Sequence, residues 1–427
     1  MRKLSKVPLL GLTFLAVASQ AHADVTFHGY GQIIAGTVFS NNRSFPPLSQ
    51  STGYHADPTF TPNSNFGLQA SAPLSGSISA TAQILAKGDN DFQPEFQWAY
   101  LKYQLNDTFA VKAGRLQTPF YQYSDYQSVG EAYPWVILPE SVYFSQVTHY
   151  DGLSLSAEKS VGDWYFLMQA IYGSVDASVS IVAPNGTGAV VGQTLHDHNL
   201  TGLTLDSSYN DWLSLRTAVF VEDITLTGDG SKDNPVTQIE DFVNYLNSQQ
   251  GMSDAAKALA TSNDPSLYYI FSAQITRNNW MLVTEYQGLQ NIAGSSGITP
   301  NLTSEYVSFG YHFGKLLPLI TFGHRNGWIR ADKIKDSIPA ANAATLDPII
   351  GGIASQPGIR AKDYFYEFGL RYDLTATVAL KLDYTFYQSH YKTSDYPELG
   401  GLALLGAPTA INPQDTHRLL AAVTFSF

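Results

Sequence analysis

The chain has 427 residues, a net charge of −12 and no cysteine. Its acidic balance argues against nucleic acid as a partner, and the lack of cysteine excludes disulfides and thiolate metal sites. Tyr and Phe number 26 and 23 although charged residues make up only 14%, and beyond the N-terminus no stretch is apolar for the roughly 20 residues that a spanning helix needs. A closed β-barrel is then the structure that remains for a membrane protein.

The first 23 residues have the pattern of a cleaved export signal. Arg2, Lys3 and Lys6 precede an apolar run from Val7 to Ala18, and Ala21-His22-Ala23 fits the small-x-small pattern that signal peptidase cleaves. Residues 1–23 are therefore predicted to be removed, and 24–427 to form the mature barrel. Removing three of the 24 basic residues leaves 21 against 36 acidic ones, a net charge of −15. The alternative, a membrane anchor, would need a longer apolar run.

Segments that alternate polar and apolar residues recur along the mature chain. Each has about 9–14 residues, the length of a tilted strand that crosses a bilayer. About sixteen are predicted, beginning near Val25, Ser64, Gly76, Gln93, Phe109, Thr148, Asp163, His196, Asp211, Ser266, Asn279, Leu302, Leu317, Lys362, Ala376 and Asp415. The last of them, ending in Phe427, resembles the C-terminal strand that marks outer-membrane barrels for assembly.

Lysine or arginine on the lipid face of a barrel costs about 2–4 kcal/mol at the bilayer midplane. The segment from Val378 to Tyr391 places Lys381 and Asp383 opposite Leu380, Leu382 and Tyr384. The aromatic face is therefore predicted to meet lipid and the charged face to meet water. This distribution predicts a polar interior, meaning a channel and not a packed core.

Short connections alternate with longer ones that are rich in Pro, Gly, Asn or Ser. Outer-membrane barrels have short periplasmic turns and long external loops, so the pattern predicts an all-β transmembrane antiparallel barrel with both termini in the periplasm. One external loop, residues 223–265, is long enough for one or two short helices. Thr237 and Glu240 have capping-box spacing there, and a second helix start is expected at Ser253. A disordered insertion is the alternative.

A second long connection, residues 118–148, is dense in aromatic residues, which need a surface to bury against. It also carries Asp125, Glu131 and Glu140, and no Lys or Arg occurs between Leu116 and Glu158. We therefore expect this loop to fold inward.

The segments Trp98-Ala99-Tyr100-Leu101-Lys102 and Val111-Lys112-Ala113-Gly114-Arg115-Leu116-Gln117-Thr118-Pro119 resemble the fourth and fifth strands of the general porins of Gram-negative bacteria. The likeness extends to the whole mature chain in architecture, but at residue level it is confined to these segments. It implies a homotrimer in which the third loop, residues 118–148, narrows each pore. It also implies that the loop acids Asp125, Glu131 and Glu140 oppose a basic cluster on the barrel wall. The tip sequence usual in that family is only partly echoed by Pro139-Glu140-Ser141.

Several residues are candidates for the charged pore wall. The polar and apolar alternation best supports an inward position for Arg216 and Arg371. Arg115, in contrast, shares its strand face with Phe109 and Val111, which are expected to face lipid. Either a bulge near Gly114 turns Arg115 inward or Lys112 is the cation of that strand; the family pattern favours Arg115, which we place in the wall. The candidate set is Arg115, Arg216, Arg325, Arg371, Lys381 and Asp383, with Lys102 and Lys112 as further cations.

Catalytic and metal sites are not indicated. The two histidines of His196-Asp197-His198 lie on the opposite strand face from Asp197, and a zinc site would need a further ligand. No Gly-x-Ser-x-Gly motif or phosphate loop is present. The expected function is passive diffusion of small hydrophilic solutes and ions, with modest cation preference and no cofactor, metal or enzymatic activity.

Two other functions compete with diffusion. The aromatic loop could form a stacking track in a channel selective for sugars or small organic acids, or the barrel could be a non-transporting adhesin or scaffold. The expected partners are outer-membrane lipid and lipopolysaccharide, small solutes and two further copies of the chain.

Overall fold

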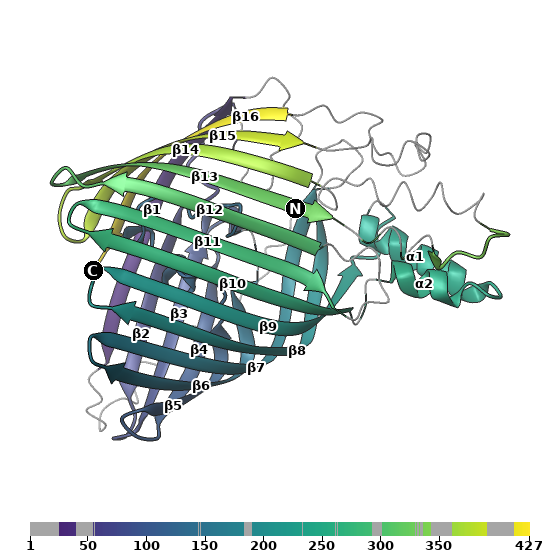
Figure 1. The fold of residues 1–427 in the computed structure, drawn as a ribbon, viewed down its shortest axis with the longest axis horizontal. Helices are drawn as coiled ribbons and strands as arrows, with labels where there is room; N and C mark the ends of the chain where they lie inside the picture. Colours follow the sequence, from purple (N-terminus) through teal and green to yellow (C-terminus); the bar gives the residue numbers. More distant parts are fainter. Residues whose placement is uncertain are drawn as a thin grey trace, which may run out of the picture.

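A computed structural model of the chain shows one closed antiparallel barrel (Figure 1). It describes residues 25–39, 54, 56–143, 145, 147–182, 190–232, 234–260, 262, 264–292, 301–328, 330, 333, 336–342, 361–390 and 414–427. The predicted signal peptide, residues 1–23, lies outside these. The strands are β1 (Thr26–Phe39), β2 (Asn65–Pro73), β3 (Ile78–Lys87), β4 (Pro94–Gln104), β5 (Phe109–Gln117), β6 (His149–Val161), β7 (Trp164–Val182), β8 (Val190–Tyr209), β9 (Leu213–Gly228), β10 (Asp264–Arg277), β11 (Trp280–Asn291), β12 (Asn301–Tyr311), β13 (Leu316–Trp328), β14 (Ala361–Asp373), β15 (Val378–His390) and β16 (Gln414–Ser426).

The ends of the chain close the barrel. β1 pairs with β16 as well as with β2, so that no strand of the sheet has an open edge. Beyond the ladder, the amide groups of Gly29 and Phe427 each donate to the other residue's carbonyl oxygen at 2.9 Å. The sixteen-stranded antiparallel barrel predicted from the sequence is confirmed within the described residues.

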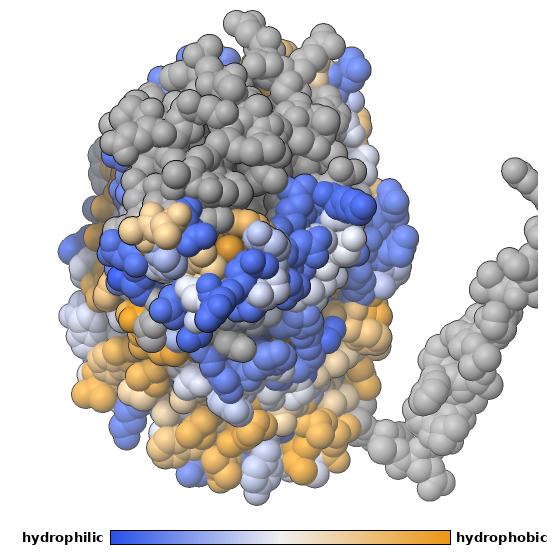
Figure 2. All heavy atoms as spheres, turned by 90° about the vertical axis from the view of Figure 1, so that its right-hand side faces the viewer, coloured by the Kyte–Doolittle hydropathy of each residue, from blue (hydrophilic) through white to orange (hydrophobic). Residues whose placement is uncertain are grey.

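Alternation along each strand separates an outer apolar face from an inner one. On β12, Ser304 and Ser308 are fully buried while Val307 and Phe309 are each 42% exposed. A large hydrophobic side chain exposed on the wall of a closed barrel is where lipid is expected to lie. Figure 2 looks at the end that carries the helices and shows hydrophilic residues over that end and hydrophobic ones along the barrel's side.

The predicted strand starts agree with the structure to within about two residues except at β8, which begins at Val190 and not near His196. Three strands also exceed the predicted length: β7, β8 and β9 have 19, 20 and 16 residues. Near their external ends the outer face carries Asp176 and His196, whose side chains are 2.5 Å apart. A polar pair on the outer face is favourable in water and costly in lipid. The hairpin of β7 and β8 therefore continues beyond the lipid-facing part of the barrel.

The connection between β9 and β10 holds two helices, α1 (Pro235–Ser248) and α2 (Ser253–Leu259), at one end of the barrel (Figure 1). The expected capping box does not begin α1. Asn234 is the N-cap, because its side chain accepts from the amide of Val236 and Pro235 follows it. Thr237 and Glu240 instead accept from the amides of Gly230 and Gly228, which ties the helix to the end of β9. None of the helices described is long and apolar enough to cross a membrane.

Candidate functional site

The loop between β5 and β6 folds into the barrel and lies along the inner side of the opposite wall. Its base is closed by a hydrogen bond from the Thr118 amide to the Thr148 carbonyl, 3.1 Å long. Two 3₁₀ turns, η2 (Ser124–Tyr126) and η3 (Gly130–Ala132), bend the chain on its way. All of its residues are described except Phe144 and Gln146. We call residues 118–148 the inward loop; its direction was predicted from its aromatic content.

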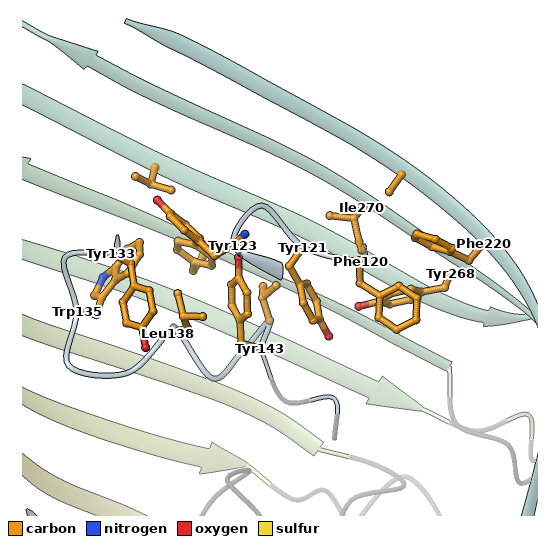
Figure 3. Close-up of a cluster of buried hydrophobic side chains, with 14 of the residues drawn as sticks. Phe120, Tyr121, Tyr123, Tyr133, Trp135, Leu138, Tyr143, Phe220, Tyr268 and Ile270 are labelled. Carbon is orange, nitrogen blue, oxygen red and sulfur yellow. Dashed lines mark hydrogen bonds between the residues drawn. The ribbon is translucent and has the colours of Figure 1, made fainter. Parts of the chain in front are cut away.

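Aromatic rings of the inward loop pack on aromatic rings of the wall (Figure 3). Phe120 lies edge-on to Phe220 of β9 and Tyr268 of β10, with ring centres 4.8 and 5.1 Å apart. Trp135 meets Tyr306 of β12 at 5.6 Å and is fully buried. Each edge-to-face ring pair stabilises the packing by about 0.5–1.5 kcal/mol in addition to the contribution of the buried apolar area.

The packing corrects one prediction. The inner face was expected to be polar throughout, yet the wall beneath the loop carries apolar and aromatic side chains such as Ile270, Val283 and Phe365. The reason is that the loop itself is aromatic and needs a dry surface. Buried side chains from β5 to β15 belong to the same cluster, and Val136 and Ile137 of the loop pack with Ile34 of β1 and Leu420 of β16.

Three basic residues of the wall bind the backbone of the inward loop. The Nζ of Lys381 donates to the carbonyl oxygens of Tyr133 (2.6 Å) and Trp135 (2.8 Å), and also to that of Gly130. Arg371 donates to the carbonyls of Glu131 and Tyr133 at 2.7 and 2.9 Å.

Arg216 binds the loop where it enters the lumen. One of its amino groups donates to the Pro119 carbonyl at 2.6 Å, and the other pairs with Asp206 of β8 at 2.8 Å. Since carbonyl oxygens of an irregular loop have no partner in a sheet, these cations satisfy groups that would otherwise be buried unpaired.

Two carboxylates satisfy the loop's amides. Asp383 accepts from the Val136 amide at 2.5 Å, and Glu285 accepts from the Gln122 amide at 2.9 Å. Glu285 also accepts from the hydroxyls of Tyr143, Tyr306 and Ser272. Burial raises the pKa of the Tyr143 hydroxyl well above its usual value, which keeps it a donor. Both carboxylates are fully buried.

Two of the three loop acids contact wall cations directly. Glu131 pairs with Arg371 at 2.5 Å, and Glu140 pairs with Arg418 at 2.7 Å while also accepting from the Tyr387 hydroxyl. Asp125 is exposed and has no ion pair within the described part of the chain. The expected geometry, with acids facing bases across the opening, is therefore wrong for Glu131 and Glu140, because the loop lies against the basic wall.

Arg115 lies on the outer face of the barrel, contrary to our placement. The ladder of β4 and β5 continues without a shift, so Arg115 keeps the side of Val111, and no bulge at Gly114 turns it inward. Arg115 pairs with Asp151 at 3.0 Å, beside the outward Leu153. Lys112 is the inward cation of β5, with its Nζ 5.3 Å from the centre of the Tyr100 ring. Alternation was the better guide here than family likeness.

Arg325 pairs with Asp363 of β14 at 3.1 Å. Sequence reasoning missed Glu285 and Arg418, which hold the loop. The signal was present, because both lie on the inner side of an alternating strand: Glu285 shares its side with Val283 and Gln287, and Arg418 with Thr424. No group of three or more metal-ligating side chains gathers among the described residues.

An opening remains between the inward loop and the wall of β1–β3. A cavity of about 180 Å³ lies there. Further along the free wall, Lys102 and Lys112 face each other across β4 and β5, and neither has an acidic partner among the residues described. The opening is thus bordered by the loop on one side and by a mainly polar wall on the other.

Solved structures with the same architecture include outer-membrane proteins. The outer membrane channel DcaP of Acinetobacter baumannii is 13% identical, covers 96% of this chain and 99% of its own, and has a TM-score of 0.56. OmpT of Vibrio cholerae in its trimer form (10% identical, 94% and 99% covered) and Salmonella typhi OmpF in complex with daunomycin (13%, 94% and 97%) each have a TM-score of 0.50. The fold is that of the Gram-negative outer-membrane porins. No protein-family model and no curated protein sequence matches this chain.

Replacing Lys381 by methionine is expected to lower the free energy of unfolding by about 3–5 kcal/mol, because buried loop carbonyls and Asp383 lose their charged partner. The measurement is urea unfolding of the protein folded into lipid vesicles. Lys257→Met, on the exposed surface of α2, is the matched control and should stay within about 0.5 kcal/mol of the unmodified protein. Equal stability of the two variants would contradict the anchoring role of Lys381.

Proposed function

We propose that the protein is an outer-membrane porin through which small hydrophilic solutes and ions diffuse passively. The observation that carries the proposal is the placement of the inward loop. Because the loop is bound to β9–β16 and also packs on β1, the polar inner face of β2–β4 stays open to water, with Gln69, Thr81 and Lys102 along it. A barrel with one packed side and one polar side is a narrowed channel.

Two features support transport over catalysis. The carboxylates that lie between the loop and the wall, Glu131, Glu140, Glu285 and Asp383, each already bind a structural partner, so none of them is free to act as an acid or base. DcaP of Acinetobacter baumannii, which has the same architecture with a TM-score of 0.56, is named an outer membrane channel. The export signal expected at residues 1–23 and the lipid-facing apolar band both fit the outer membrane.

Planar bilayers provide the test of the channel. Purified protein folded in detergent is expected to insert with discrete conductance steps, and protein-containing liposomes should swell in isotonic solutes at rates that fall with solute size. Protein boiled before addition serves as the control. A correctly folded preparation that inserts yet gives no steps would refute the porin assignment and favour an adhesin or scaffold.

The buried position of the loop's aromatic rings argues against a selective channel with an aromatic stacking track. The rings of Phe120, Tyr121 and Trp135 are 4%, 2% and 0% exposed and pack on the wall, so they offer no continuous surface to a solute. A solute that binds in the opening therefore has to contact other residues there.

We propose a modest cation preference, supported by the chain's charge of −12 and by the exposed Asp125. Glu131 and Glu140 were expected to contribute to this cation preference, but their ion pairs with Arg371 and Arg418 remove most of that contribution. The positive charges of Lys102 and Lys112 lower the cation preference.

Asp125→Asn should lower the cation-to-anion permeability ratio about fourfold, since a charge about 10 Å away in water attracts a cation and repels an anion by roughly 0.4 kcal/mol each. Lys112→Gln should raise the ratio by a similar factor. Both are measured as reversal potentials under a KCl gradient, and Asp254→Asn on the exposed surface of α2 is the control. Anion selectivity of the unmodified protein would contradict the proposal.

We propose further that the protein is a homotrimer whose subunits meet through the outer face of β2–β6. One row of neighbours crosses this face: Ala70, Ala82 and Ala99, followed by Arg115 and Asp151. Small side chains allow close approach of another backbone, and an ion pair is costly against lipid. The row therefore fits a protein neighbour. OmpT of Vibrio cholerae has been solved in a trimer form.

Ala82→Trp is expected to shift the detergent-solubilised protein from trimer to monomer, because an indole cannot fit a close contact. Ala170→Trp on the outer face of β7, next to Leu155 and Leu203, is the matched control and should remain trimeric. Light scattering coupled to size exclusion reports the mass. A monomeric unmodified protein in mild detergent would refute the trimer.

A further inference from the structure

The cavity between the inward loop and β1–β3 has features of a binding site. Its lining comes from β1 and β2, from the returning segment before β2, from the turn after β3, and from the inward loop: Gln32, Pro62, Asn63, Ser64, Asn65, Lys87, Asp89, Gln127, Ser128, Tyr133, Ile137, Leu138, Glu140 and Tyr143. Its volume of about 180 Å³ corresponds to roughly six waters at ~30 Å³ each. Any solute that passes between the loop and this wall meets these residues.

Three amide oxygens in the lining lack a hydrogen-bond donor. They are Oε1 of Gln32, Oδ1 of Asn63 and Oδ1 of Asn65, each buried and without a partner among the residues that the structure describes. Gln32 and Asn65 are only 4% and 6% exposed. A buried acceptor left unpaired costs about 1–3 kcal/mol, so these three oxygens favour a molecule that brings O–H or N–H groups.

The charges around the cavity balance. Glu140 is neutralised by Arg418 at 2.7 Å, and Lys87 lies near Asp89. Burial raises the pKa of Asp89, whereas the ammonium of Lys87 lowers it. With one cation close to one anion and no net charge left over, the cavity offers no strong attraction to an ion.

Besides the further polar residues Ser64, Gln127 and Ser128, the lining contains apolar and aromatic side chains. Tyr133 and Tyr143 of the inward loop contribute rings, and Pro62, Ile137 and Leu138 contribute aliphatic surface. Precisely placed polar acceptors beside an apolar wall are typical of small-molecule sites. A molecule that pairs hydroxyl groups on its edge with C–H groups on its face matches both kinds of lining.

We propose that this cavity binds a neutral, hydroxyl-rich solute of monosaccharide size, with its hydroxyls donating to Gln32, Asn63 and Asn65. The proposal rests on the porin function, which it deepens by naming a solute class and a site. Binding makes passage of such a solute saturable, whereas a simple opening would give a flux proportional to concentration.

The test is glucose uptake into liposomes that contain the folded protein, measured over a range of glucose concentrations. Saturation is expected. Asn65→Leu removes one acceptor and should raise the half-saturating concentration about tenfold, the equivalent of one lost hydrogen bond of ~1.4 kcal/mol. Asn65→Asp keeps an acceptor at the position and should remain closer to the unmodified protein than Asn65→Leu.

Gln169→Met is the matched control. Gln169 is another inner-face amide, but it lies on β7, donates to Ser154 at 2.9 Å and does not line the cavity. The half-saturating glucose concentration of the Gln169→Met variant should stay within about twofold of that of the unmodified protein, a change below ~0.5 kcal/mol. Discrete conductance steps from each variant show that its barrel is intact.

The outcomes separate the two proposals. Conductance steps with glucose uptake that stays linear would overturn the binding site and leave the porin function standing. Saturation by glycine but not by glucose would overturn the neutral class in favour of a zwitterion held by Lys87 and Asp89. Saturation unaffected by Asn65→Leu would place binding elsewhere. A preparation with no conductance at all would refute the porin function itself.

Discussion

Charged side chains of the barrel wall bind the backbone of the inward loop, and this contact decides how much of the lumen stays open. A loop inside a barrel has carbonyl and amide groups that no strand satisfies. Lys381 and Arg371 supply donors to its carbonyls, while Asp383 and Glu285 accept from its amides. Without them, the aromatic packing would have to bury unpaired backbone groups, and the loop could not lie flat against one wall.

Such anchoring has an electrostatic consequence. Charges that bind a loop are not available to a passing ion, so a list of acidic and basic residues overstates the field in the opening. Glu131 and Arg371 lie 2.5 Å apart and largely cancel each other. What remains at the free side is sparse: Asp125 on the loop, and Lys102 and Lys112 on the wall. A weakly charged opening lined by amides suits neutral solutes at least as well as ions.

The outer surface shows the same separation of roles. Most of it is the apolar band that a bilayer requires, as on β12 with Val307 and Phe309. The row from Ala70 to Asp151 departs from that band, and its small residues and ion pair suit protein better than lipid. The proposed subunit contact and the proposed lipid contact thus fall in different sectors of one sheet, and the proposed solute contact falls on its inner face.

Period-two alternation in the sequence was enough to predict the closed barrel, its strand number and most strand positions, because each strand must place apolar side chains toward lipid whatever its neighbours are. The same alternation assigned Lys112 and Arg371 to the inner face. Loop 118–148 was expected to turn inward because its aromatic residues needed burial. What the sequence left open was where that loop comes to rest. The inward-loop partners of Lys381, Glu285 and Arg418 lie 142 to 278 positions away along the chain, and no local pattern encodes such a pairing. Only the tertiary structure, by bringing the loop onto β9–β16, decided that these charges bind backbone and that the opening lies beside Gln32 and Asn65.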